Sequence, residues 1–303
     1  MPKDILDGKV SERSIARISD EHIARLAHHK LRTGDIVFGR RGDIGRQALV
    51  TNRESGWLCG TGCLRITLGD SQLDPAYLHY YLRDEAVVEG IAQLAIGATM
   101  PNLNTAILRG IPIRFPPLAV QRGIATTLSA YDDLIENNTR RIAILEEMAR
   151  RIYEEWFVRF RFPGHEGVRM VESELGLVPA TWRACLLGDE IELAYGKALK
   201  AEDREAGLVP VYGSSGVVGT HSKSLVAGPG IIVGRKGNVG SVHWCEGPFF
   251  PIDTVYYVKT VLPLHFVYFN LKHQNFLNND AAVPGLNRNQ AYALPLQSFP
   301  IQV

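Results

Sequence analysis

The sequence has few cysteines, no long apolar runs and almost no net charge. Its four cysteines in 303 residues are too few and too scattered for a disulfide framework. Cys59 and Cys63 form a close pair, but no second pair completes a zinc site. All four are therefore expected to be buried thiols in a reducing cytosol. The formal net charge is +1, so a nucleic-acid site would have to be local.

Membrane and export signals are also missing from the sequence. No stretch approaches the length of a membrane span, and no apolar core of a signal peptide follows Met1. A cytoplasmic protein without a membrane partner is expected.

One long helix is the most distinctive element that the sequence predicts. It is expected over residues 121–160, between Pro116-Pro117 and Pro163-Gly164, because both pairs interrupt helices. Its apolar positions follow the 4-3 spacing of a coiled-coil seam. The seam consists of Ile124, Leu128, Tyr131, Ile135, Asn138, Ile142, Leu145, Ala149, Ile152 and Trp156. This spacing favours a partner helix, although an amphipathic helix lying on its own domain is the alternative.

Two segments that flank the helix repeat one another. Residues 36–45 and 231–240 each predict a strand, a glycine loop and a second strand. Further matches follow in the same order, which indicates duplicated domains. These matches pair 98–104 with 281–287 and 111–113 with 294–296, and each copy has a proline-started helix, from Pro75 to about Gln93 and from Pro263 to about Leu277.

The predicted fold class is α+β, with two duplicated mixed α/β domains joined by one long coiled-coil-type helix. The expected boundaries are 1–117 for the first domain, 118–163 for the helix and 164–303 for the second domain. The first copy is expected to lack its opening strands, and no second long helix follows the second copy.

The glycine loops are candidate phosphate-binding elements. Glycine allows close backbone approach, and arginine or lysine beside free amides suits phosphate oxygens. A plain hairpin with solvated arginines is the alternative. A helix of some 35 residues is about 50 Å long, which compares with about 34–36 Å for a turn of B-DNA. Two copies of one module on such a spacer favour duplex DNA and a bipartite target.

Comparison of the two copies divides the candidate DNA-binding residues into two groups. Basic residues that the copies share cannot encode two different half-sites, so they are assigned to phosphates or to the scaffold. Base-reading residues are expected where the copies diverge, at about 197–223, and among the polar residues near the second shared motif. The candidates are Arg40, Arg41, Arg46, Asn102, Asn104, Lys197, Ser214, Ser215, Lys223, Arg235, Lys236, Asn238, Asn287, Arg288 and Asn289.

Three stretches, with Trp156-Phe157 near the helix end, resemble the specificity subunit of type I restriction–modification systems. They are Gly34–Gly45, Pro101–Asn104 and Ile113–Gln121. The resemblance covers nearly the whole chain and implies two target-recognition domains spaced by helices that dock modification subunits. The family normally carries a complete first recognition domain and a second long helix, and both are curtailed here.

The resemblance also implies which chemistry belongs to other chains. Modification subunits methylate adenine with S-adenosylmethionine, and restriction subunits translocate and cut DNA with ATP and Mg. This chain is therefore expected to be non-catalytic, with no cofactor or metal of its own. Its exposed seam is expected to favour self-association, including a homodimer through the long helix.

Two other functions use the same glycines. Gly234-Arg235-Lys236-Gly237 resembles the GXXG loop of a KH module that binds single-stranded nucleic acid, but that loop joins two helices. A nucleotide-binding enzyme with a phosphate loop is the other alternative. The Gly-Lys-Ser/Thr end of a Walker loop is missing, and the residues after the glycines do not favour a Rossmann helix. Signatures of restriction-type nucleases and amino-methyltransferases are missing as well.

Overall fold

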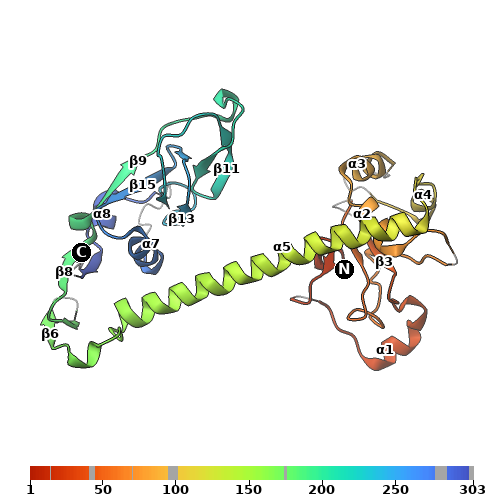
Figure 1. Cartoon of the computed structure of the whole chain (residues 1–303), viewed down its shortest axis with the longest axis horizontal. Helices are drawn as coiled ribbons and strands as arrows, with labels where there is room; N and C mark the ends of the chain where they lie inside the picture. Colours follow the sequence, from red (N-terminus) through yellow and green to blue (C-terminus); the bar gives the residue numbers. More distant parts are fainter. Residues whose placement is uncertain are drawn as a thin grey trace. The chain divides into compact units, whose positions relative to one another are not determined.

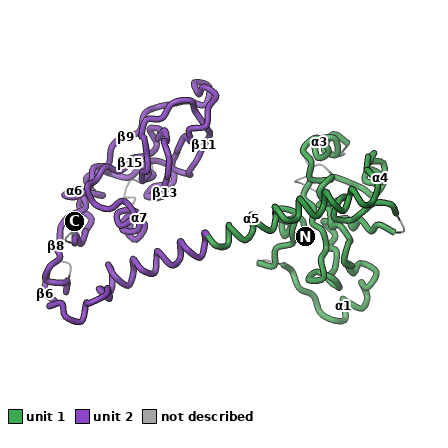
Figure 2. Tube along the Cα trace, viewed as in Figure 1, with its two compact units in different colours: residues 1–141 green, residues 142–303 purple. Residues whose placement is uncertain are grey.

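The chain forms two compact units, Met1–Arg141 and Ile142–Val303, in a computed structural model (Figure 2). None of the helices in the described part of the chain combines the length and apolar character needed to cross a bilayer. The described residues are 1–13, 15–40, 45–69, 71–94, 102–173, 176–276 and 285–299.

The first unit is built on a three-stranded antiparallel sheet in the order β4-β3-β5, and its central strand is labelled in Figure 1. Its central strand β3 (Ile36–Gly39) is buried along its length, and β4 (Gln47–Leu49) and β5 (Cys63–Ile66) pair on either side. The other elements are η1 (Pro2–Asp4), β1 (Ile5–Leu6), β2 (Lys9–Val10), α1 (Asp20–Arg25), η2 (Ala27–His29), α2 (Pro75–Tyr81), α3 (Glu85–Leu94) and α4 (Thr105–Arg109).

The proline-started helix of the first unit is divided into α2 and α3. The Asp74 side chain caps α2 by accepting hydrogen bonds from the amides of Ala76 and Tyr77. The Asp84 carboxylate accepts from the amides of Ala86 and Val87 and so starts α3. The single helix expected from Pro75 to Gln93 is therefore wrong, because a second capping aspartate restarts it.

The second unit contains a four-stranded antiparallel sheet in the order β13-β12-β15-β9. Its strands are β12 (Gly230–Gly234), β13 (Val242–Cys245), β15 (Val255–Thr260) and β9 (Ile191–Tyr195). A second sheet, β11-β10-β14, consists of β10 (Val209–Gly213), β11 (Gly216–His221) and β14 (Phe250–Pro251). The remaining elements are η4 (His165–Gly167), β6 (Met170–Ser173), β7 (Gly176–Pro179), β8 (Arg183–Leu186), α6 (Leu187–Glu190), η5 (Ala201–Asp203), α7 (Leu264–His273), α8 (Arg288–Tyr292) and β16 (Pro295–Ser298).

Strand β12 is buried on both faces, which explains its continuous apolar sequence. Alternate residues of a strand face opposite sides of the sheet. Ile231 and Val233 therefore join the core that includes Phe266 of α7, whereas Ile232 joins the cluster around Tyr212 of β10.

The two units share the same three-stranded core. In each, a buried central strand is flanked by antiparallel neighbours, with β4-β3-β5 corresponding to β13-β12-β15. The duplicated α+β fold is thus confirmed. Strand β9 has no counterpart paired to β5 among the described residues of the first unit.

The long helix α5 runs from Leu118 to Tyr153 and continues as a π-helical turn, η3 (Glu154–Val158). It begins three residues earlier than expected, because the amides of Val120 and Gln121 both donate to the carbonyl oxygen of Pro117. It ends before Pro163-Gly164. Phe160 adopts a left-handed backbone conformation, and Phe157 packs against Phe266 in the core of the second unit.

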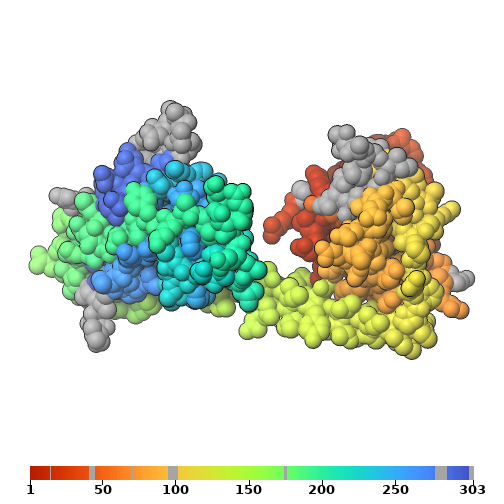
Figure 3. All heavy atoms as spheres, turned by 90° about the horizontal axis from the view of Figure 1, so that it is seen from above, coloured from red at the N-terminus to blue at the C-terminus, as the bar shows by residue number. Residues whose placement is uncertain are grey.

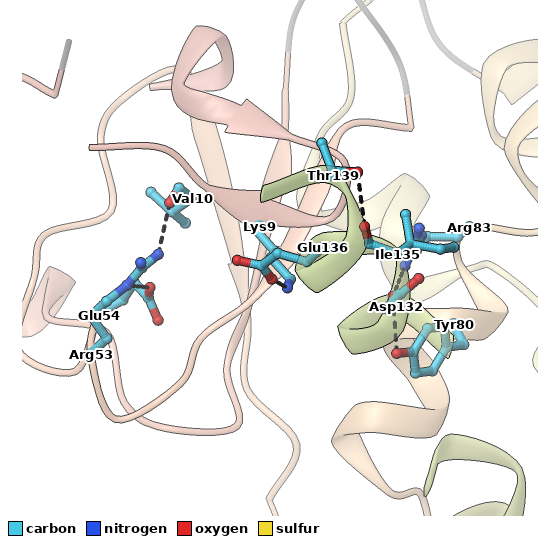
Figure 4. A network of polar contacts seen from close by, with 10 residues as sticks. All are labelled: Lys9, Val10, Arg53, Glu54, Tyr80, Arg83, Asp132, Ile135, Glu136 and Thr139. Carbon is cyan, nitrogen blue, oxygen red and sulfur yellow. Dashed lines mark hydrogen bonds and ion pairs between the residues drawn. The ribbon is translucent and has the colours of Figure 1, made fainter. Parts of the chain in front are cut away.

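The N-terminal part of α5 is fixed to the first unit by Gln121. Its side chain is 0% exposed, accepts from the amide of Asp74 at 2.8 Å and donates to the carbonyls of Gln72 and Pro116. Further along, Asp132 accepts from Arg83 at 2.7 Å and from Tyr80 at 3.1 Å (Figure 4). These hydrogen bonds explain how the N-terminal part of α5 packs on the first unit although its apolar face is exposed.

The C-terminal part of α5 is fixed to the second unit by Tyr153. Its ring stacks on Phe157 and Phe269, and its hydroxyl accepts from the side-chain amide of Asn270 at 3.1 Å. Burial raises the pKa of the Tyr153 hydroxyl to about 12.

Candidate nucleic-acid interface

Each unit brings its two repeated motifs together through the same main-chain hydrogen bond. In the first unit the amide of Leu103 donates to the carbonyl of Arg40 at 2.9 Å, and in the second the amide of Leu286 donates to that of Arg235 at 2.7 Å. The bond places the arginine that follows the central strand beside an asparagine-capped helix. Asn104 caps α4 and Asn287 caps α8.

The flanks of the glycine loop are strands in both units. Residues Gly234–Gly240 connect the antiparallel strands β12 and β13, and β3 and β4 pair in the same way. A KH loop joins two helices, so these strands do not favour that alternative. Gly237 has a φ of +79°, a conformation that disfavours any residue with a Cβ atom.

The shared arginine is held by different groups in the two units. In the first unit, Nε of Arg40 donates to the side-chain oxygen of Asn102 at 3.2 Å. In the second unit Gly285 occupies the position that matches Asn102. There the Arg235 guanidinium lies 4.9 Å from the ring centroid of Tyr195, and its Nη1 donates to the carbonyl of Asp253 at 3.2 Å.

The hairpin of β10 and β11 brings one predicted base-reading pair to the glycine loop. The Ser214 hydroxyl accepts from the amide of Asn238 at 3.3 Å, and its carbonyl accepts from the hydroxyl of Ser241 at 2.6 Å. Ser215 is its neighbour in the same turn. Lys197 follows the end of β9, where its amide donates to the carbonyl of Pro251.

Other candidates lie apart from this hairpin turn or outside the described residues. Lys223 lies beyond the far end of β11, where it pairs with Glu205 at 3.3 Å. A six-residue strand is about 20 Å long, so Lys223 is not brought to the Ser214 turn.

The remaining candidates lie near the loops of both units or outside the described residues. Arg46 is half-buried immediately before β4, and its carbonyl accepts from the amide of Gly39. Arg41 lies outside the described residues. Lys236 and Asn289 are exposed.

Tyr195 lies beside Arg235 and the glycine loop of the second unit, and no pattern in the sequence predicts this position. Its side chain is 48% exposed at the end of β9, and Arg235 and Arg288 both lie over its ring. Among the described residues, neither arginine has a carboxylate within ion-pairing distance, 4.0 Å. No sequence motif marks Tyr195, because only the pairing of β9 with β15 brings it beside Arg235.

The helix seam is exposed along α5 and its π-helical turn. Its large apolar side chains are between 38% (Leu128, Trp156) and 63% (Ile135) exposed, and the side chain of Asn138 is exposed as well. Yellow-green atoms of α5 lie at the surface in Figure 3. Within the described part of the chain, no second helix covers this seam. The full set is Ile124, Leu128, Tyr131, Ile135, Asn138, Ile142, Leu145, Ala149, Ile152 and Trp156.

Comparison with protein families and curated relatives points to one family. Residues 15–147 match the family model described as the type I restriction modification DNA specificity domain. The type I restriction enzyme MjaIX specificity subunit of Methanocaldococcus jannaschii is 27% identical over 198 residues, which are 64% of this chain and 45% of that protein. The putative type I specificity subunit S.MgeORF438P of Mycoplasma genitalium is 27% identical over 211 residues, 65% and 51% respectively. The chain spans about half the length of these curated relatives.

A solved structure shares the fold. The crystal structure of a type I restriction–modification S subunit from M. genitalium has a TM-score of 0.59 and 23% sequence identity, and the match covers 89% of this chain and 73% of that one. The family model and the curated relatives confirm the resemblance seen in the sequence, and this structure shows the shared fold.

Proposed function

We propose, because residues 15–147 belong to the type I restriction modification DNA specificity domain family, that the chain recognises double-stranded DNA as the specificity subunit of a type I restriction–modification complex. In this role it is non-catalytic. It directs adenine methylation by modification subunits and cleavage by a restriction subunit, which bind S-adenosylmethionine, ATP and Mg in its place. The proposed site of action is the cytoplasm.

The observation that carries this proposal is the repeated contact between the two motifs. Both units hold one arginine at the end of the central strand, through the Arg40–Leu103 and Arg235–Leu286 bonds. An arginine that the same main-chain bond positions in both units suits a ligand with repeated phosphates. The two units would then each address one half-site of a bipartite target.

The proposed division of labour follows from what the two units share and where they differ. Arg40 and Arg235 would bind phosphates, which position the protein without reading sequence. The β10–β11 turn of the second unit, at Ser214 and Ser215, lies beside the glycine loop, whereas the first unit has a shorter β1–β2 hairpin with Asp7 and Gly8 in its turn. Such a unit-specific polar turn suits base reading in the major groove.

The exposed seam of α5 is the proposed protein-binding surface. Side chains such as Ile135, Ile142 and Leu145 are more than half exposed, and burial of apolar area of this kind stabilises association by about 25 cal/mol per Å². Modification subunits are the proposed partners in the complex. In their absence, a second copy of this chain is proposed to cover the seam.

A competition experiment tests the proposal against the KH alternative. The full chain, alone and with a modification subunit, is titrated with labelled duplex DNA and then with unlabelled duplex or single strand of the same sequence. We expect the duplex to compete and the single strand to compete poorly. Preferential binding of the single strand, or failure of the chain to bind a modification subunit, would contradict the proposal.

A further inference from the structure

Tyr195 and Tyr256 form an aromatic pair across neighbouring strands of the second unit. They lie opposite each other in the β9–β15 ladder, with ring centroids 5.0 Å apart and an interplanar angle of 60°. Tyr256 is 2% exposed and its hydroxyl donates to the carbonyl of Leu286 at 3.3 Å, whereas nearly half of Tyr195 faces solvent. The buried ring therefore supports the exposed one.

Two guanidinium groups share the exposed ring. Arg235 lies 4.9 Å and Arg288 lies 5.2 Å from the ring centroid of Tyr195. Arg235 also lies 5.8 Å from Tyr256, and Arg288 lies 5.9 Å from Tyr292. An aromatic face attracts a cation and fixes the plane of a guanidinium.

The two guanidinium groups have no carboxylate partner among the residues that the structure describes. In the described part of the chain, no carboxylate pairs with Arg235 or Arg288, although Lys259 nearby on β15 pairs with Glu192 at 3.1 Å. Two like charges on one ring repel each other, and the attraction of both to an anion between them offsets this repulsion. The local electrostatics thus favour a negatively charged ligand.

Comparison with the first unit supports a role for the orientation of the arginine. The strand position that matches Tyr256 is Leu64, as the register of β3 with β5 and of β12 with β15 indicates. Arg40 consequently has no ring from this strand to lie on, and its Nε bonds to Asn102 instead. The two corresponding arginines are thus oriented by different contacts, Arg40 by an asparagine and Arg235 by aromatic rings. An arginine side chain that only faced water would need neither contact.

We propose that Arg235, Arg288 and Tyr195 form a clamp for one phosphate of the DNA backbone, with Tyr195 as the positioning residue. The inference deepens the DNA-recognition role proposed above and rests on it. Each guanidinium has five N–H donors. Arg235 uses one on Asp253, so both arginines keep N–H donors for phosphate oxygens, with which arginine forms strong charge-assisted hydrogen bonds.

Salt-dependent binding of the full chain to a short duplex of random sequence tests the clamp. Each phosphate contact that is lost lowers the slope of log K against log salt by about 0.9 in magnitude. Arg288→Ala is expected to lower the slope by up to about that amount, because Arg235 alone is left on the phosphate. Tyr195→Ala is expected to lower it by a similar amount, because both arginines lose their ring. Tyr195→Phe is expected to keep the wild-type slope, since the ring remains.

Lys272→Ala is the matched control, because Lys272 lies 4.9 Å from the ring centroid of Tyr268 on α7 and forms a cation–π pair elsewhere in the unit. It should leave the slope unchanged, and thermal unfolding checks that every variant is folded. A wild-type slope in Tyr195→Ala, or an equal loss in Tyr195→Phe and Tyr195→Ala, would overturn the clamp while leaving DNA binding intact. If the wild-type chain binds no duplex at any salt concentration, the proposed function itself fails, and the clamp with it.

Discussion

The main-chain amide of Leu286 donates a 2.7 Å hydrogen bond to the carbonyl oxygen of Arg235. This single bond ties the loop after the central strand to the segment that begins α8, and the bond from Leu103 to Arg40 does the same in the first unit. Two motifs that are distant in the sequence become one surface in each unit.

Substitution of the shared arginines should weaken DNA binding without changing its sequence preference. Arg40→Ala and Arg235→Ala each remove a guanidinium assigned to the phosphate backbone, so all duplexes should bind more weakly and with a smaller salt slope. Parallel titrations of several duplexes check this. A changed preference among sequences would show that the arginine reads bases.

Removal of the Gln121 side chain should destabilise the first unit. Gln121→Ala deletes three hydrogen bonds and leaves the amide of Asp74 and two carbonyls without those partners. The expected loss of unfolding free energy is roughly 2 to 3 kcal/mol, measured by urea denaturation. Gln93→Ala, at an exposed position of α3, is the control and should change little. Equal stability of the two variants would refute the anchoring role.

The stability of the first unit should fall in acid because of His79. Burial, with a smaller contribution from the charge of Arg83, lowers the pKa of the His79 imidazole to about 4. The imidazole is thus neutral in the folded chain but takes up a proton below about 6.5 when unfolded. Its stabilisation is complete above about pH 6.5 and is lost as the pH falls towards 4.

Thermal unfolding between these pH values measures the effect. His79→Gln retains a polar side chain but cannot titrate, so part of the pH dependence of the melting temperature should disappear. If the melting temperature of that variant depends on pH as in the wild type, titratable groups other than His79 cause the dependence.

The exposed seam should drive self-association of the isolated chain. Ile135→Glu and Leu145→Glu place charges on side chains that are 63% and 60% exposed. They should therefore abolish association while leaving the melting temperature nearly unchanged. Analytical ultracentrifugation over a range of concentrations detects the difference. Leu208→Glu, at a residue that is 95% exposed outside α5, is the control and should associate like the wild type. A wild-type monomer at tens of micromolar would contradict the prediction.

The sequence could predict the long helix and the duplication because both depend on repetition. The 3.5-residue spacing and the paired glycine loops persist whatever packs around them. The end of α5 could not be predicted in the same way, because the π-helical turn accompanies the packing of Phe157 against Phe266.

The surface around Arg235 was only partly predictable. Arg235 and Arg288 lie in repeated or polar motifs and were proposed as DNA ligands from the sequence. Tyr195 was missed because its place depends on the register of β9 against β15. Lys223 was grouped with Ser214 by sequence alone, but the length of β11 separates them.

Mapping of methylated adenines in cells that co-express this chain with a cognate modification subunit tests the central claim most directly. If the chain selects DNA through two related units, methylation should appear at one bipartite motif, and Arg40→Ala or Arg235→Ala should reduce its extent without changing the motif. Methylation identical to that of the modification subunit alone would contradict the account.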